Sequence, residues 1–483
     1  MRKRVLILST SAGSGHKAAA SALEKVFCSY AEVEQVVNKD ALELTNEAHR
    51  SLYSKVFLDL VQKYPRFLGW WYDESDEPWK TDDMRLMLDR LNAEPLVKFI
   101  KHFDPDITVC THFMPAGIIS HLLSKKELHT ILSIVTTDYD FHSMWLSQLF
   151  HRYFVALDET KAHLIALGLT ESHITVSGIP VDPAFSAPVQ HTDVLAKYDL
   201  RPDKPVLLLS AGTFGNSPMK TVVEQFLQLR HDVQTVIICG RNRELRRDIE
   251  VLVAAQPTNF RVLGYTHDIA SLMKIATLFI GKPGGLTSSE CMAVGLPMVI
   301  CMPIPGQEER NSDHLLEKGA AIKCNDLTVV AYKIDKLLDD PDRLQQMRIN
   351  TQRLAQPDAA QIIAETLLKA TDISPMYIDK ETRRRMAEAA RGTIGMPPFA
   401  TVQNGEQVLL YDAQTGVLVG AITELQLQFL LDHLEEENEH DDDYYINQAT
   451  VEMLEDLGAS AELLTVLQKA IAGVGEADIR WVH

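Results

Sequence analysis

Short apolar runs alternate with helical patterns along most of this 483-residue chain, and no other feature constrains its fold as strongly. Strand-like runs occupy residues 4–10, 33–40, 106–112, 130–138, 152–158 and 174–180 in the first half, and 206–215, 235–242, 261–266, 276–285 and 297–303 in the second. Strands separated by helices predict a parallel sheet that is covered by helices on both faces.

The alternation is interrupted once, at the polar and proline-containing stretch 186–205. We therefore expect two doubly wound, Rossmann-like α/β domains that face a cleft, with residues 1–190 in the first and 200–371 in the second. Ligands of such sheets bind at the carboxyl ends of the strands. Residues 372–483 contain a predicted hairpin and two helical patterns, which indicate a small α+β accessory module.

The net charge of −19 is unevenly distributed. Residues 372–483 have 7 Lys and Arg against 21 Asp and Glu, whereas residues 1–371 have 40 against 45. An acidic tail and a nearly neutral body argue against nucleic acid as a partner. Peripheral contact between the body and a membrane stays open, and the tail module is a candidate for homo-oligomer formation or regulation.

Targeting and redox features are sparse. The apolar run before the first glycine loop is too short for a signal peptide, and no stretch approaches the ~18 apolar residues of a membrane span. The six cysteines have no clustered spacing, which argues against a zinc site or a disulfide framework. We expect a cytoplasmic protein with reduced, buried thiols.

The stretch STSAGSGHKAAAS, residues 9–21, raises the question of a phosphate-bearing ligand. A P-loop is excluded because His16 interrupts the pattern and Ala18 replaces the required hydroxyl residue. A dinucleotide fingerprint fits Gly13, Gly15 and Ala18, with Asp40 ending the next strand, but nothing later supplies a hydride-transfer site. A helix start favours an anion, and His16 is either a general base or a solvent-facing residue.

The stretch GKPGGLTSSECMAVGLPMVICMPIPGQEERN, residues 281–311, is more specific. Its glycine loop leads into a helix whose first amides can hold a diphosphate. Glu290, one turn into that helix, is placed to accept hydrogen bonds from two ribose hydroxyls. The strand that follows ends in three polar side chains suited to the hydroxyls of a hexose, namely Gln307, Glu308 and Asn311.

Together these motifs resemble the GT-B glycosyltransferases of family 28, specifically the monogalactosyldiacylglycerol synthases and processive diacylglycerol glucosyltransferases. The family's S-x-G-x-G-H-x-x-A loop matches Ser11, Gly13, Gly15, His16 and Ala19, and its TD…H…W segment matches TTDYDFHSMW, residues 136–145. The similarity extends over about residues 4–370. The acidic module has no counterpart in it, and the loop SAGTFGNS departs from the more glycine-rich family pattern.

The resemblance implies a UDP-hexose donor, UDP-glucose or UDP-galactose, and a lipid acceptor such as diacylglycerol. His16 would be the catalytic base, assisted by Asp138. The residues implied on the acceptor side are Gly13, Gly15, His142 and Trp145. Those implied in donor binding are Gly212, Thr213, Phe214, Gly215, Gly264, Tyr265, Thr266, Pro283, Gly284, Gly285, Leu286, Thr287, Glu290, Gln307, Glu308 and Asn311.

The expected chemistry is a single inverting displacement with UDP as the leaving group. Helix termini and amides would stabilise its charge, so no obligatory metal or other cofactor is expected. Two alternatives remain: a transferase with a soluble or different lipid-linked acceptor, and a non-catalytic UDP-sugar-binding regulator. The aromatic-rich stretch 44–95 is either a packed helical hairpin or an element that meets lipid.

Overall fold

In a computed structural model, the chain folds as two compact units, Met1–Gly392 and Thr393–His483. It describes residues 2–11, 13–45, 72, 76, 78–79, 93–210, 218–370, 374–393, 408–412, 418–423, 426–427, 429–430, 443–456, 459–471 and 476–482. Structural statements below concern these residues.

The first sheet has six parallel strands in the order β2-β1-β3-β4-β6-β7. Its buried strands are rich in Val, Ile and Leu, as expected of a sheet covered on both faces. The strands are β1 (Lys3–Ser9), β2 (Val33–Asp40), β3 (Ile107–Cys110), β4 (Ile131–Val135), β6 (Arg152–Val155) and β7 (Ile174–Val176).

The second sheet repeats this plan in the order β10-β9-β8-β11-β12-β13, again with parallel pairing. Its strands are β8 (Val206–Ser210), β9 (Gln234–Ile238), β10 (Phe260–Leu263), β11 (Leu278–Gly281), β12 (Met298–Cys301) and β13 (Ala321–Cys324). The predicted pair of doubly wound domains is therefore confirmed.

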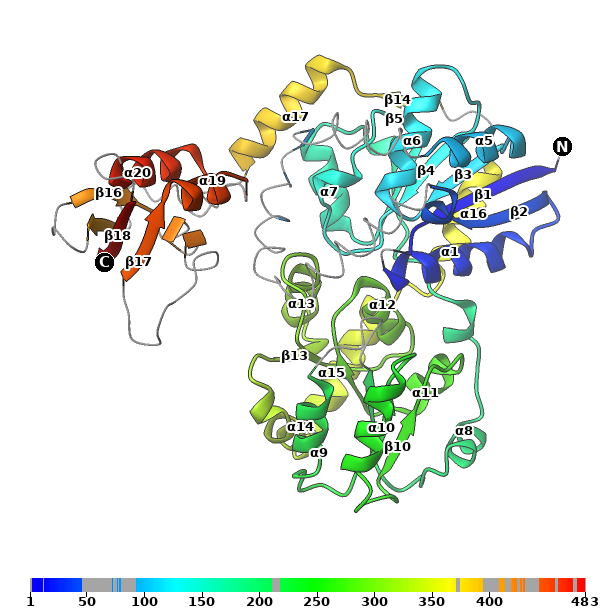
Figure 1. Ribbon diagram of the computed structural model, residues 1–483. Coiled ribbons are helices and arrows are strands. Elements are labelled where there is room, and N and C mark those ends of the chain that lie inside the picture. Colours follow the sequence, from blue (N-terminus) through cyan, green and yellow to red (C-terminus); the bar gives the residue numbers. More distant parts are fainter. Residues whose placement is uncertain are drawn as a thin grey trace. The chain divides into compact units, whose positions relative to one another are not determined.

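Helices connect the strands of both sheets (Figure 1). Those of the first half are α1 (Ser14–Phe27), α5 (Glu94–Phe103), α6 (Phe113–Ser124) and α7 (Asp158–Ala166). Those of the second half are α8 (His191–Lys197), α9 (Met219–Phe226), α10 (Arg243–Leu252), α11 (Ile269–Ile275), α12 (Gly285–Ala293), α13 (Gln307–Glu317), α14 (Val330–Leu338) and α15 (Pro341–Leu354).

The chain returns to the first sheet after completing the second. Helix α16 (Ala359–Lys369) lies beside α1 (Figure 1), and its Ile363 and Leu367 share a buried core with Val5 and Ile7 of β1. A short strand, β14 (Met376–Tyr377), then pairs with β5 (Leu149–Phe150). This late crossing ties both halves of the first unit together.

The same return reaches further along the chain. Helix α17 (Lys380–Thr393) places Met386 in the core of the first sheet. The boundary between the two compact units lies between residues 392 and 393. The domain limits expected from the sequence, 1–190, 200–371 and 372–483, stay a prediction.

The second unit has its own core. Strands β15 (Val408–Asp412) and β16 (Leu418–Ile422) form the hairpin expected from the sequence, and β18 (Glu476–Val482) and β17 (Asp443–Asn447) extend it in the order β16-β15-β18-β17. Helices α19 (Gln448–Asp456) and α20 (Ala461–Ile471) supply Leu454 and Leu467 to the buried cluster.

Two sequence expectations can be checked directly. Five of the six cysteines are buried, whereas Cys28 is exposed, and all six are free thiols. Within the described part of the chain, no helix is both long enough and apolar enough to cross a membrane.

Candidate active site

His16 lies in the first turn of α1, where the carboxyl ends of three neighbouring strands meet. Its Nδ1 is 2.8 Å from the carbonyl oxygen of Thr111, which follows β3. The same nitrogen is 2.9 Å from Oγ1 of Thr137, which follows β4. The Thr111 hydroxyl donates to the carbonyl oxygen of His16 at 2.9 Å. The ring is thus held by side chains and backbone from two other strands.

These contacts also assign the tautomer of His16. A carbonyl oxygen can only accept, so the ring hydrogen is assigned to Nδ1 and the lone pair to Nε2. The Nε2 edge runs along Gly13, where a Cβ atom would lie 3.8 Å from Nε2. Withdrawal from water lowers the pKa of His16 to about 4, against the opposing effect of the hydrogen bond with Thr111. Near neutral pH the ring is an uncharged proton acceptor.

A second histidine, His112, packs against His16 and was missed by the sequence analysis. The two rings meet edge to face with their centroids 4.6 Å apart. His112 is buried, and its Nδ1 accepts a hydrogen bond from the amide of Met114 at 3.1 Å. Its position directly after β3, the neighbour of β1, was the signal that could have identified it.

Asp138 faces the second half of the unit. Its carboxylate accepts hydrogen bonds from Nε2 of Gln307 and, at 3.1 Å, from Nδ2 of Asn311. Burial raises the pKa of Asp138 to about 6, although these two hydrogen bonds act to lower it. These bonds tie Asp138 to α13, and the assistance that it was expected to give His16 stays a prediction.

The two glycine-led helices meet at their starts. A Cβ atom at Gly15 would lie 3.7 Å from Cβ of Leu286, in the first turn of α12. Gly285 lies so close to the loop after β4 that its Cβ would fall 2.1 Å from the carbonyl oxygen of Thr137. Pro283 is buried and Gly284 is the N-cap residue. The first amides of α12, from Gly285 to Thr287, have no acceptor within the helix.

Glu290 lies one turn further along α12. Burial raises its pKa to about 8, and the negative charge of Asp182 acts in the same direction. No described residue forms a hydrogen bond with its carboxyl group. A partly buried acid of this kind is a candidate for binding a ligand's hydroxyl groups.

The expected hexose-binding residues lie at the start of α13 but differ in their contacts. Oε2 of Glu308 accepts a hydrogen bond from the amide of Ile304 at 2.7 Å, and burial raises its pKa to about 7 despite the nearby charge of Lys282. Asn311 is fully buried, and its Oδ1 accepts from the amide of Tyr139 at 3.0 Å. The side-chain amide of Asn311 therefore connects α13, in the second half of the first unit, to the loop after β4, in its first half.

The region expected to meet uracil follows β10. Tyr265 is 57% exposed, and the Arg241 guanidinium lies 5.1 Å from the centre of its ring. A Cβ atom at Gly264 would lie 3.6 Å from the carbonyl oxygen of Gly240. Thr266 accepts a hydrogen bond from the amide of Asp268 at 3.0 Å, which shapes the turn. Arg241 was not singled out by the sequence analysis.

Part of the expected site lies outside the described residues. This holds for the first donor-domain loop, Gly212, Thr213, Phe214 and Gly215, and for most of the aromatic stretch 44–95.

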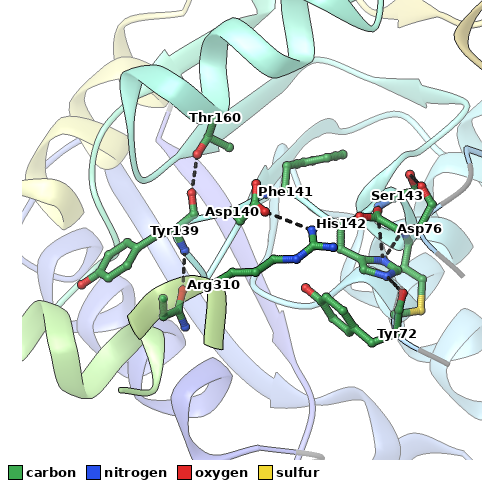
Figure 2. A network of polar contacts seen from close by, with 11 residues as sticks. Tyr72, Asp76, Tyr139, Asp140, Phe141, His142, Ser143, Thr160 and Arg310 are labelled. Carbon is green, nitrogen blue, oxygen red and sulfur yellow. Dashed lines mark hydrogen bonds and ion pairs between the residues drawn. The ribbon is translucent and has the colours of Figure 1, made fainter. Parts of the chain in front are cut away.

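His142 and Trp145, which are expected on the acceptor side, are among the described residues, as is Tyr72. Nε2 of His142 donates to the carbonyl oxygen of Tyr72 at 2.8 Å, and Nδ1 accepts from the amide of Met144 at 3.1 Å (Figure 2). Trp145 is buried, with its ring centroid 6.3 Å from that of His16.

Asp40, the acidic residue of the dinucleotide fingerprint, forms its contacts with the protein near the first glycine loop. It accepts hydrogen bonds from the amide of Ser11 at 3.2 Å and from the amide of Leu42 at 3.1 Å, and it pairs with Lys17 at 3.4 Å. A dehydrogenase would direct this side chain toward a ribose. Among the described residues, no group of three or more His, Cys, Asp and Glu side chains is arranged to hold a metal ion.

Two six-stranded parallel sheets in tandem, each with helices between its strands, define the GT-B fold. The family model for monogalactosyldiacylglycerol (MGDG) synthase matches residues 16–181, and that for glycosyl transferases group 1 matches residues 193–354. The chain belongs to the family of processive diacylglycerol glucosyltransferases and monogalactosyldiacylglycerol synthases.

Relatives support this membership over most of their length. The processive diacylglycerol beta-glucosyltransferase of Bacillus pumilus (strain SAFR-032) is 31% identical over 377 residues, which are 77% of this chain and 96% of the relative. The enzyme of the same name from Bacillus subtilis (strain 168) is 30% identical over the same shares.

Solved structures support the fold. Acinetobacter baumannii MurG matches with a TM-score of 0.50 at 18% identity, over 76% of this chain and all of the other. A Staphylococcus aureus MnaA–UDP complex matches with a TM-score of 0.51 at 15% identity, over 75% and 94%.

Proposed function

We propose that the protein transfers a hexose from UDP-hexose to a hydroxyl group of a lipid, with diacylglycerol as the acceptor. The observation that carries the proposal is the meeting of a neutral His16, whose Nε2 is a proton acceptor, with the N-terminal end of α12. The relatives' names favour diacylglycerol, and favour UDP-glucose over UDP-galactose.

The donor would be bound along the second sheet. The diphosphate lies at the first turn of α12, whose amides and partial positive charge favour an anion. The carboxyl group of Glu290 binds the ribose hydroxyls, because it lies one turn beyond and has no hydrogen-bond partner among the described residues. Tyr265 and the backbone of Gly264 meet the uracil, and Gln307 with Glu308 contacts the hexose.

The acceptor hydroxyl would approach from the His16 side. Nε2 of His16 takes the hydroxyl proton as the oxygen attacks the anomeric carbon of the hexose. The bond between that carbon and the UDP oxygen breaks with its electron pair, so UDP leaves as an anion and the anomeric configuration inverts. Amides aimed at the developing charge stabilise it, with no obligatory metal or other cofactor in the proposal.

The partners and the location follow from this activity. A lipid acceptor requires contact with a membrane surface, so we propose a cytoplasmic protein that binds the cytoplasmic membrane face peripherally. Homo-oligomer formation through the acidic C-terminal unit is the proposed role of that unit. Nucleic acid is not a proposed partner.

The test is transfer of radiolabelled hexose from UDP-glucose or UDP-galactose, with and without diacylglycerol liposomes. We expect lipid-extractable label from one donor, and its loss in both His16→Ala and Glu290→Ala. UDP binding is measured by calorimetry in parallel. His16→Ala should bind UDP normally, whereas Glu290→Ala should bind it weakly.

Two other results have distinct meanings. Label on a water-soluble acceptor instead of lipid would replace diacylglycerol as the acceptor. Tight UDP-hexose binding without turnover, unaffected by His16→Ala, would identify a regulator.

A further inference from the structure

Arg310 of α13 forms ion pairs with two carboxylates that lie far apart in the sequence of the first half of the chain. Its Nη1 lies 3.0 Å from Oδ2 of Asp76 and 3.0 Å from Oδ2 of Asp140 (Figure 2). The Arg310 side chain is 30% exposed and that of Asp76 is 19% exposed. Screening by water is therefore incomplete, and the pairing is stronger than that of fully exposed charges.

Asp76 is also fixed from the other side. Its Oδ1 accepts a hydrogen bond from the amide of Ser143 at 2.7 Å, and its carbonyl oxygen accepts from the Ser143 hydroxyl at 2.6 Å. Four residues earlier, the Tyr72 ring packs against that of His142 with centroids 4.2 Å apart. Residues 72 and 76 are thus anchored to the loop after β4, which the proposed function places on the acceptor side.

The same short stretch also touches the donor side. Gly306, the N-cap of α13, has a φ of +85°, and a Cβ atom there would lie 2.8 Å from Cδ1 of Tyr72. The Arg310 guanidinium lies 5.2 Å from the centre of the Tyr72 ring. Any side chain at position 306 would push Tyr72 away from the start of α13.

The charges explain why Arg310 matters for this arrangement. Without its guanidinium, the Asp76 carboxylate, 19% exposed, and the Asp140 carboxylate, 42% exposed, would lose the cation that both of them contact. Like charges at short range repel, so the stretch containing Tyr72 would separate from α13. Helix α13 carries Gln307 and Glu308, which contact the hexose in the proposed function. The separation would therefore displace the acceptor side from the bound hexose.

We propose that Arg310 is a positioning residue that couples the acceptor-side stretch, Tyr72 and Asp76, to the hexose-binding start of α13. In this proposal it acts through Asp76, Asp140 and Tyr72, the three residues that its guanidinium contacts. The inference rests on the proposed function for the identity of the acceptor. The coupling itself is a property of the protein alone.

The central experiment compares Arg310→Met and Arg310→Lys with the wild-type protein. We expect Arg310→Met to lower kcat/KM for the lipid acceptor about 100-fold, because small displacements of reacting groups have effects of this size. The Kd for UDP should change less than about threefold, since the amides of α12 are untouched. Arg310→Lys should recover part of the activity, because an ammonium group cannot reproduce the planar fork of arginine.

A matched control is the ion pair between Lys318 and Glu159, at 3.1 Å, in which Lys318 is about as exposed as Arg310 but its acidic partner is 63% exposed. Lys318 directly follows α13 and Glu159 lies in α7, so this pair also joins the two halves. Lys318→Met should leave the acceptor kinetics unchanged. Adding Asp76→Asn to Arg310→Met should restore part of the lost acceptor kinetics, because one repelling charge is removed.

Hydrogen–deuterium exchange tests the coupling without any transfer assay. Arg310→Met should accelerate exchange in peptides that contain residues 72–76, and Lys318→Met should not. Unchanged exchange, or equal losses of acceptor turnover and UDP affinity, would overturn the inference. If the wild-type protein transfers no hexose, the proposed function fails while the exchange experiment still decides the coupling.

Discussion

The protonation state of His16 is the property on which the proposed chemistry depends. An imidazole must be unprotonated before it can take a proton, and withdrawal from water keeps this one neutral by lowering its pKa to about 4. The hydrogen bond from Nδ1 to the carbonyl oxygen of Thr111 directs the lone pair to Nε2. Thr137 contributes a second contact to the same nitrogen.

We predict that His16 stays neutral down to about pH 4 in the ligand-free protein. An imidazole ¹⁵N NMR titration should show Nδ1 protonated and Nε2 unprotonated between about pH 8 and pH 5. A midpoint for His16 near its ordinary value of about 6.5 would contradict the prediction.

Glu290 allows a test that separates ligand binding from stability. Its pKa in the folded protein, about 8, is above that of an ordinary glutamic acid. The folded state therefore binds the proton more tightly than the unfolded state, and stability declines as pH rises from about 4.5 to about 8. At higher pH the buried charge is fully present and its cost is greatest.

Glu290→Gln should therefore raise the Tm at about pH 8.5, where the free energy of unfolding should rise by ~1–4 kcal/mol. The same substitution should weaken UDP binding about tenfold or more, since a carboxylate accepting ribose hydroxyls is lost. Differential scanning fluorimetry and calorimetry measure the two effects. The exposed Glu244 of the same half, changed to Gln, should alter neither quantity.

At the scale of elements, the start of α12 owes its position to a glycine. The carbonyl oxygen of Thr137 occupies the space that a side chain at position 285 would need. Gly284 differs, because the nearest atom to a Cβ there is Oε1 of Glu308 at 3.6 Å, an ordinary contact distance. Two adjacent glycines thus have different structural demands.

We predict that Gly285→Ala lowers the free energy of unfolding by about 1–3 kcal/mol, as overpacked substitutions do. Gly284→Ala should change stability by less than about 0.5 kcal/mol, because its Cβ meets no close atom. Urea denaturation of both variants measures the difference. Equal stability of the two would show that the helix can shift without cost.

Sequence patterns predicted the elements well where periodicity and burial agree. Strand β2 begins and ends where the pattern placed it, at residues 33 and 40. Strand β13, whose residues include Lys323, had no continuous apolar run and was not predicted. The pairing of β5 with β14 joins residues too far apart in sequence for any local pattern to indicate.

At the scale of the whole molecule, the acidic unit 393–483 is a separate body with its own buried cluster. The alignment with the Bacillus pumilus relative covers 96% of that protein but only 77% of this chain. A unit that folds around its own core and lies beyond the family's extent is not required to build the site.

We predict that a chain of residues 1–392 retains UDP affinity and hexose transfer within about threefold of the full chain, because the described site lies in the first unit. Sedimentation velocity on both chains shows whether the acidic unit changes the oligomeric state. Loss of transfer with normal UDP affinity would assign the unit a role in acceptor binding. A chain that ends at residue 371 should be less stable, because Ile378 and Met386 complete the core of the first sheet.

The sequence alone predicted the class of fold and most of the strands along the chain, because these depend on local periodicity. It singled out His16, Glu290 and the glycine loops by their positions, and the family resemblance implied the role of His16 as the base, which stays a prediction. Only the tertiary structure decided which partners those residues have. Asp138 bonds to α13, His112 packs beside His16, and Arg310 joins Asp76 to Asp140. Contacts between residues far apart in sequence arise when elements pack, and no local pattern carries that information.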